Sequence, residues 1–151
     1  MKPNQSSAIV LGLLATLVIV GCAKSTFQKN EDLQNAAKKG SLEGVVAAIE
    51  EGAEINSQDY YGRTALIYAA ENGYLDIVKL LVNKGAKVNV QDYTSGTALI
   101  VATAKGHDKV VAFLLEHGAN PDIKGITGSA HDLVNPKDTL LVRTLLKPNP
   151  K

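Results

Sequence analysis

The amino-acid sequence predicts an all-α solenoid of about four helix-pair units, two full and two capping, with short projecting hairpin loops. Two observations predict this fold class. Gly-Ala pairs recur three times at a step of 33 residues, and Gly40, Gly73 and Gly106 keep the same step. In the middle unit, apolar residues are also spaced as on one face of a helix. A period of this size is typical of units that bury their apolar faces by stacking on one another.

The first 21 residues are predicted to be an export signal, because Lys2 precedes an apolar run over residues 8–20. That run is shorter than the roughly 20 residues that a membrane-spanning helix needs. It leads into Cys22, the only cysteine, through the segment IVGC, residues 19–22, which resembles the lipobox of bacterial lipoproteins. The resemblance implies cleavage before Cys22 and acylation of that residue. An ordinary cleaved signal, or an uncleaved anchor with an incidental cysteine, is the alternative.

Residues 22–30 are predicted to be the acylated cysteine and a flexible tether, and residues 148–151 a disordered tail. Because Ala23 rather than Asp follows the cysteine, the lipoprotein resemblance implies an outer-membrane anchor, with the protein facing the periplasm. Cleavage would leave 15 basic and 15 acidic residues. No cluster of Lys and Arg is interleaved with aromatic residues, so we expect no nucleic-acid partner.

The repeat domain is predicted to span residues 31–147, and its first unit, residues 31–59, lacks the Gly-x-Thr that opens the middle unit. We interpret this unit as an N-terminal cap. Residues 31–60 carry seven acidic and two basic residues. This imbalance would steer a basic partner toward the first unit, or it is a solvated cap face.

The middle unit, residues 62–92, contains two short apolar stripes. Leu66, Ala69 and Ala70 lie at helical spacing, and Gly73 is placed to end their helix in a left-handed turn. A second stripe over residues 75–84 predicts another helix before Gly85. Isolated helices shorter than about 12 residues are marginal in water, so stacking must supply the core.

The sequence of this unit, GRTALIYAAENGYLDIVKLLVNKGAKVNVQD, resembles the ankyrin repeat. The resemblance implies helix pairs, projecting hairpins and a role in binding other proteins. In the next unit, residues 95–124, the glycine at Gly96 comes one place late, so we expect an altered entry turn. The last unit fits with one residue deleted and contains Asn135-Pro136, which predicts an irregular end because proline disfavours a helical residue before it.

The sequence does not show a catalytic or metal-binding constellation. His107, His117 and His131 lack a second ligand at helical spacing, and there is no pair of cysteines. The repeat resemblance gives His107 a structural role at a turn, and we expect His117 to lie in solvent before Gly118. No serine has the glycine elbow of a nucleophile. We therefore expect a protein that is not an enzyme and needs no cofactor or metal.

The candidate binding residues are those at hairpin tips and on the exposed side of the first helices, where the repeat resemblance places partner contacts. Tyr and Arg are enriched at interface hot spots, although the tip tyrosines alternatively pack along neighbouring hairpins. The partner-binding candidates are Gln58, Tyr60, Tyr61, Arg63, Glu71, Asn72, Gln91, Tyr93, Thr94 and Lys105.

The expected function is that of a membrane-tethered periplasmic module, monomeric when free, that binds a partner protein. It is expected to inhibit a toxin or hydrolase as an immunity protein does. The alternative is a scaffold or protector of a resident periplasmic enzyme. A third hypothesis is a hydrolase with an unfamiliar site around His131 and Asp132.

Overall fold

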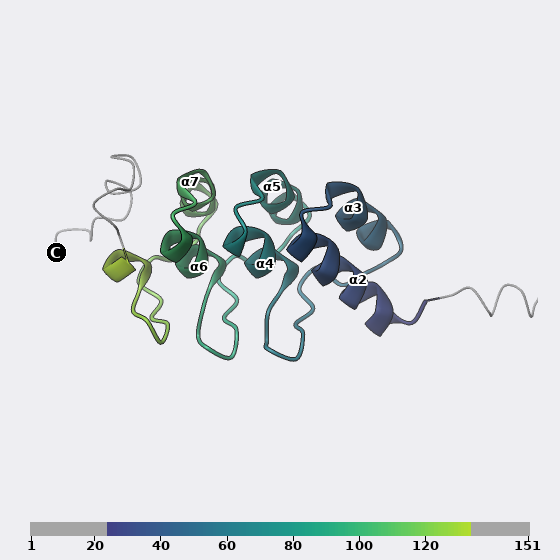
Figure 1. The fold of residues 1–151 in the computed structure, drawn as a ribbon, viewed down its shortest axis with the longest axis horizontal. Helices are drawn as coiled ribbons and strands as arrows, with labels where there is room; N and C mark the ends of the chain where they lie inside the picture. Colours follow the sequence, from purple (N-terminus) through teal and green to yellow (C-terminus); the bar gives the residue numbers. More distant parts are fainter. Residues whose placement is uncertain (1–23, 134–151) are drawn as a thin grey trace, which may run out of the picture.

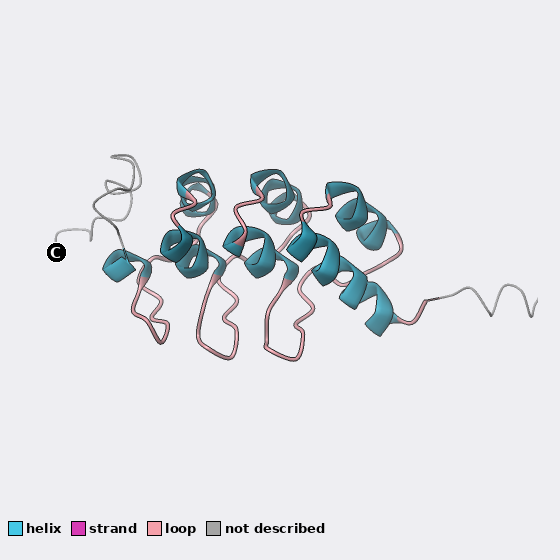
Figure 2. Ribbon diagram, in the orientation of Figure 1, coloured by secondary structure: helices cyan, strands magenta, loops and turns pink. Residues whose placement is uncertain are grey.

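The computed structural model describes residues 24–133, which form a row of helix pairs (Figure 1). Within this range there are six α-helices, one 3-10 helix and no β-strand (Figure 2). The elements are α2 (Thr26–Lys39), α3 (Leu42–Glu50), α4 (Ala65–Glu71), α5 (Leu75–Asn83), α6 (Ala98–Lys105), α7 (Asp108–Glu116) and η1 (Ala130–Leu133). The described residues confirm the predicted all-α solenoid.

The helices form two layers. The first helices of the pairs, α2, α4 and α6, lie side by side with η1 after them, while α3, α5 and α7 form the second layer (Figure 1). Helix α4 packs against both α2 and α6, and α6 contacts η1. The hairpin loops project from the stack on the side away from the second layer (Figure 1). This arrangement places the hairpins next to the exposed side of the first helices.

The first helices begin and end at repeated positions. Thr64 and Thr97, one step apart, each cap a helix by accepting a hydrogen bond from the backbone N–H three residues later, at 3.4 and 3.2 Å. Gly40 and Gly106 end α2 and α6 in the left-handed conformation, with φ of 77° and 74°. The same capping chemistry therefore starts α4 and α6 at equivalent positions one repeat apart.

The buried core residues recur at the 33-residue step. Leu33, Leu66 and Leu99, one from each first helix, are buried. The second helices contribute Val45, Val78 and Val111 at equivalent positions. Buried alanines such as Ala69, Ala70 and Ala102 let neighbouring first helices approach closely, because their side chains fill little volume.

Asparagine side chains join successive units. The Asn56 carboxamide oxygen accepts a hydrogen bond from the Lys87 amide at 2.8 Å, and Asn89 accepts one from the Asn120 amide at the same distance. Within the first helix pair, the Asn30 side-chain oxygen accepts a hydrogen bond from the Glu54 amide at 2.8 Å. A side chain that binds the backbone of the next unit fixes the separation of the two units, since both groups must stay within hydrogen-bond distance.

The structure corrects the predicted start of the repeat domain. The sequence predicts a flexible tether up to residue 30, whereas α2 begins at Thr26 with Ser25 as its cap. The segment after Thr26 contains neither glycine nor proline, so it extends the helix at little cost. Lys24 also forms ion pairs with Asp32 and Glu51 at 2.8 and 3.0 Å. The described part of the predicted tether is therefore attached to the first unit.

The described part of the last unit is irregular, because its first helix is only the four-residue 3-10 helix η1. Its predicted second helix, Asn135-Pro136 and the tail at 148–151 lie outside the described residues. So do Cys22 and the predicted export signal. Among residues 24–133, none of the helices combines the length and the apolar character required to cross a membrane.

Candidate functional site

Two aspartates shape the hairpin tips. The Asp59 Oδ1 atom accepts hydrogen bonds from the amides of Tyr61 and Arg63, at 2.8 and 2.9 Å. One repeat later, Asp92 Oδ1 accepts from the amides of Thr94 and Gly96, at 2.9 and 2.8 Å. A short carboxylate that binds its own following backbone holds a tight turn. These turns carry the tyrosines of the two tips.

The entry turn of the third unit differs from our expectation. The late glycine predicts an altered turn, but Ser95 adopts the left-handed conformation that Gly62 has one repeat earlier, with φ of 58° against 73°. The Ser95 amide donates to the Asp92 carbonyl oxygen at 2.8 Å, as the Gly62 amide donates to that of Asp59 at 2.9 Å. The turn is kept because its hydrogen bonds fix the backbone, and Ser95 bears the strain.

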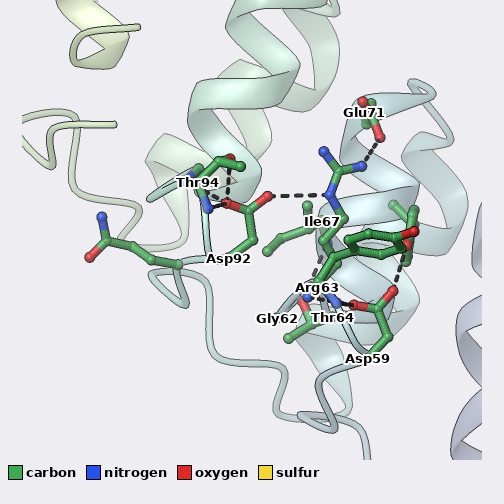
Figure 3. Close-up of polar contacts among 12 residues, drawn as sticks. Asp59, Gly62, Arg63, Thr64, Ile67, Glu71, Asp92 and Thr94 are labelled. Atoms are coloured by element: carbon green, nitrogen blue, oxygen red, sulfur yellow. Dashed lines mark hydrogen bonds and ion pairs between the residues drawn. The ribbon is translucent and has the colours of Figure 1, made fainter. Parts of the chain in front are cut away.

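Arg63 forms two ion pairs, one within its own unit and one with the next hairpin turn (Figure 3). Its Nη1 atom lies 2.6 Å from Glu71 Oε2, and its Nε atom lies 3.2 Å from Asp92 Oδ2. The Asp92 side chain is only 1% exposed. Burial alone would raise the pKa of the Asp92 carboxyl, but hydrogen bonds from Thr94 and Gly96 and the Arg63 charge hold it below its ordinary value. Asp92 is therefore a buried carboxylate that these contacts keep ionised.

The aromatic ring of Tyr68 lies beneath the Arg63 guanidinium group. Its hydroxyl donates to Asp59 Oδ2 at 2.5 Å. The Arg63 guanidinium carbon and the Lys38 ammonium each lie 5.5 Å from the centre of its ring. Burial, followed by the hydrogen bond to Asp59 and its charge, raises the pKa of Tyr68 to about 12. The side chain is thus a neutral hydrogen-bond donor at physiological pH.

A groove of about 1070 Å³ runs between the hairpin tips and the first helices. Eight of the ten predicted binding residues line it, so the structure brings most of them to one surface. The eight are Tyr60, Tyr61, Arg63, Glu71, Asn72, Tyr93, Thr94 and Lys105. The remaining lining residues are Lys38, Tyr68, Asp92 and His107.

The other two predicted residues, Gln58 and Gln91, do not line the groove. The Gln58 amide nitrogen donates to the carbonyl oxygens of Gly62 and Gln91, at 2.7 and 3.2 Å. Gln91 donates to those of Ser95 and Lys124, at 3.1 and 3.4 Å. Their side chains join each hairpin to the next, which is a structural role.

The tip tyrosines remain largely in solvent, with Tyr60 88%, Tyr61 64% and Tyr93 77% exposed. Tyr60 and Tyr61 meet edge to face with ring centres 5.5 Å apart. Tyr93 packs on the neighbouring hairpin, because a Cβ built on Gly62 would come within 2.6 Å of its ring. Packing between hairpins therefore orients Tyr93 without burying it.

The sequence reasoning missed four lining residues for different reasons. Tyr68 and Asp92 sit at buried positions that the repeat pattern assigns to the core and the turn. Lys38 comes from the first unit, which we interpreted only as a cap. His107 has the predicted structural role, since its Nε2 atom lies 3.0 Å from the carbonyl oxygen of Glu71, and it also lines the groove.

The other histidines do not line the groove. His117 is exposed as expected and stacks on Phe113 with ring centres 3.9 Å apart. His131 Nε2 lies 3.2 Å from the Asp122 carboxylate. Asp132 accepts hydrogen bonds from the Ser129 amide and hydroxyl, both at 2.8 Å, as at the start of a helical turn. Residues 24–133 contain no group of three or more His, Cys, Asp or Glu side chains placed to hold a metal ion.

Comparison with known proteins supports the repeat pattern. The family model described as "Ankyrin repeats (3 copies)" matches residues 18–125, which include every residue that lines the groove. A search of curated proteins gives no match. The three copies agree with the three helix pairs found among the described residues.

Proposed function

The chain belongs to the ankyrin-repeat family, and we propose that it captures a partner protein in the groove between its hairpin tips and first helices. Ankyrin repeats are protein-interaction modules and are typically scaffolds rather than enzymes. Fold alone does not locate the binding surface, so that part of the proposal depends on the groove itself.

The observation that carries the proposal is the exposure of three tyrosines beside Arg63, Glu71 and Asp92, which are held together by ion pairs. Tyr60, Tyr61 and Tyr93 offer large contact areas with few rotatable bonds. Beneath them, Arg63 is held by two carboxylates. Binding at such a surface costs little conformational entropy, since hydrogen bonds already order the turns and ion pairs already order Arg63.

We further propose that Cys22 is acylated and tethers the module to the outer membrane on its periplasmic side. The support is the sequence IVGC after an apolar run preceded by Lys2. More than one acyl chain would be needed for stable attachment, since a single chain binds membranes only marginally. Metabolic labelling of the protein with a fatty-acid analogue tests this, and labelling that persists in the Cys22→Ser variant would contradict it.

The partner role has two versions. An inhibitor or immunity protein would block an incoming toxin or hydrolase at the membrane, and a scaffold would hold a resident periplasmic enzyme. A toxin gene beside this one supports the first version, and an envelope-enzyme gene supports the second. The third hypothesis, hydrolysis around His131 and Asp132, finds little support, because Asp132 instead binds Ser129 within a turn.

Capture by the full-length protein tests the groove. The Y60A/Y61A/Y93A variant should lose the partners that wild-type protein captures by crosslinking and mass spectrometry, while keeping its helical content and melting temperature. The matched control is F27A/I126A, which removes two exposed apolar side chains outside the groove, 77% and 78% exposed. Capture that survives the tyrosine variant would place the site elsewhere.

A further inference from the structure

The charges that line the groove do not cancel. Its two carboxylates, Glu71 and Asp92, are both engaged by Arg63. Lys38 and Lys105 also line the groove, are exposed, and form no ion pair with any residue in the range 24–133. The lining side chains, three basic and two acidic, therefore carry a net charge of +1, and Lys38 and Lys105 are the two cations that the lining carboxylates do not hold.

These two lysines lie on opposite sides of the groove. Lys38 belongs to α2 and Lys105 to α6, and α4 lies between these helices. At roughly 8–10 Å for each step between packed helices, the two side chains are attached about 16–20 Å apart. An extended chain rises about 3.3 Å per residue, so about five or six residues span that separation.

The acidic residues of the first unit supply no lining carboxylate to the groove. None of the seven acids in residues 31–60 lines the groove. Asp59, the one nearest to it in sequence, accepts hydrogen bonds from Tyr68 and from two backbone amides. The sequence imbalance that would attract a basic partner therefore does not extend into the groove.

We infer that the groove binds an extended segment of the partner protein, about five or six residues long, with acidic side chains toward its two ends and apolar or aromatic side chains between them. The acidic groups meet Lys38 and Lys105, and the apolar groups lie on Tyr60, Tyr61 and Tyr93. This inference rests on the proposed function and adds the chemistry of the partner.

A protein segment fits the groove better than a nucleic acid does. A continuous phosphate backbone would bring negative charge beside Glu71 and Asp92, which line the same surface. In a peptide, acidic residues can be separated by neutral ones, so that neutral residues lie opposite Glu71 and Asp92. It also supplies the apolar side chains that three exposed tyrosines can cover.

The test is selection of a displayed library of random octapeptides against the full-length protein in detergent micelles. We expect the selected peptides to be enriched in Asp and Glu together with apolar residues. The K38Q/K105Q variant should lose the acidic enrichment. The K79Q/K109Q variant, which removes the same charge from exposed positions outside the groove, should keep it.

Affinities of the best selected peptide, measured by fluorescence anisotropy, provide the second readout. Lys38→Gln and Lys105→Gln should each weaken binding about two- to fivefold at low salt, as expected for an exposed ion pair, and the loss should shrink as salt is added. Unchanged affinity in both variants would overturn the inference.

The outcomes separate this inference from the proposed function. Peptides that depend on the tyrosines but are neutral or basic would overturn the acidic segment and leave the groove as the binding site. Peptides that bind the Y60A/Y61A/Y93A variant as well as wild type, or a library with no enrichment, would overturn this inference, whereas the partner-capture experiment decides the proposed function. Preferential binding of a single-stranded oligonucleotide competitor would also overturn the inference.

Discussion

The imidazole ring of His107 lies over Gly73, so that a Cβ on Gly73 would come within 2.7 Å of the ring. One repeat earlier, the ring of Tyr74 covers Gly40 in the same way, at 2.6 Å. Each ring therefore occupies the space left by a missing side chain in the preceding unit. The contact joins adjacent units at the end of each first helix.

This contact predicts unequal costs for two glycine substitutions. Gly73 and Gly106 have φ of 75° and 74°, but nothing lies within 4 Å of a Cβ on Gly106. Both changes to alanine should cost about 1 kcal/mol for the left-handed backbone. Gly73→Ala should cost about 1–2 kcal/mol more, because it displaces the His107 ring. Urea denaturation followed by far-UV circular dichroism measures both, and equal losses would contradict the ring contact.

The Arg63 network predicts coupled losses of stability. Arg63→Gln should lower the free energy of unfolding by about 1–3 kcal/mol, because it leaves the buried Asp92 carboxylate without its cation. The R63Q/D92N double variant should lose less than the sum of the two single variants. Denaturation of all three, with the exposed Lys79→Gln as control, measures the coupling. Additive losses would show that the pair does not act as a unit.

Tyr68 predicts a loss of stability in alkaline solution. Its pKa rises from 10.0 to about 12 in the folded state, so the unfolded chain releases the proton first as pH increases. The stabilisation is complete below pH 10 and is lost as pH rises from 10 through about 12. Tyr68→Phe should lack up to about 2–3 kcal/mol of this pH dependence.

Absorbance titration of tyrosinate gives an independent check on Tyr68. The wild-type protein should show one tyrosine that ionises late, at a pH of about 12, and the Tyr68→Phe variant should lack that late step. Tyr93→Phe serves as the control, since it removes an exposed tyrosine. A wild-type titration with no late step would contradict the buried hydrogen bond to Asp59.

The third-unit turn predicts a stabilising substitution. Ser95 is the one residue other than glycine with positive φ among residues 24–133. Ser95→Gly should raise the free energy of unfolding by about 0.5–1 kcal/mol, because glycine relieves the left-handed strain. Gly96→Ala should lower it, since its Cβ would lie 3.2 Å from Asp92 Oδ1. Thermal denaturation compares the two, and destabilisation by Ser95→Gly would contradict the assigned strain.

The sequence predicts the helix pairs well because buried positions require apolar residues and left-handed turns favour glycine, and both recur at the same spacing. Leu66, Leu99 and the Gly-Ala pairs recur at one step, and the structure places them at equivalent positions. It predicts the groove less completely. Asp92 and Tyr68 are read as turn and core residues, since the pattern does not reveal that Arg63 crosses from one unit to the next.

Two features that the sequence does not predict have local physical causes. Gln58 and Gln91 are polar and near the tips, yet their amides bind backbone carbonyls of the neighbouring hairpins. The start of α2 is misplaced because a polar segment without glycine or proline suits a helix as well as a tether. In both cases the contacts that decide the outcome lie far along the chain or depend on a single capping serine.

The hydrogen bonds of Asn56 and Asn89 to the following units affect how the number of repeats in this protein can change. Asn56 and Asn89 attach to the following unit through the same backbone amide position, so each junction repeats the chemistry of the one before it. A duplicated or deleted block of 33 residues would therefore meet a ready-made neighbour on either side. Recombination between such blocks lengthens or shortens the array without requiring a newly evolved junction.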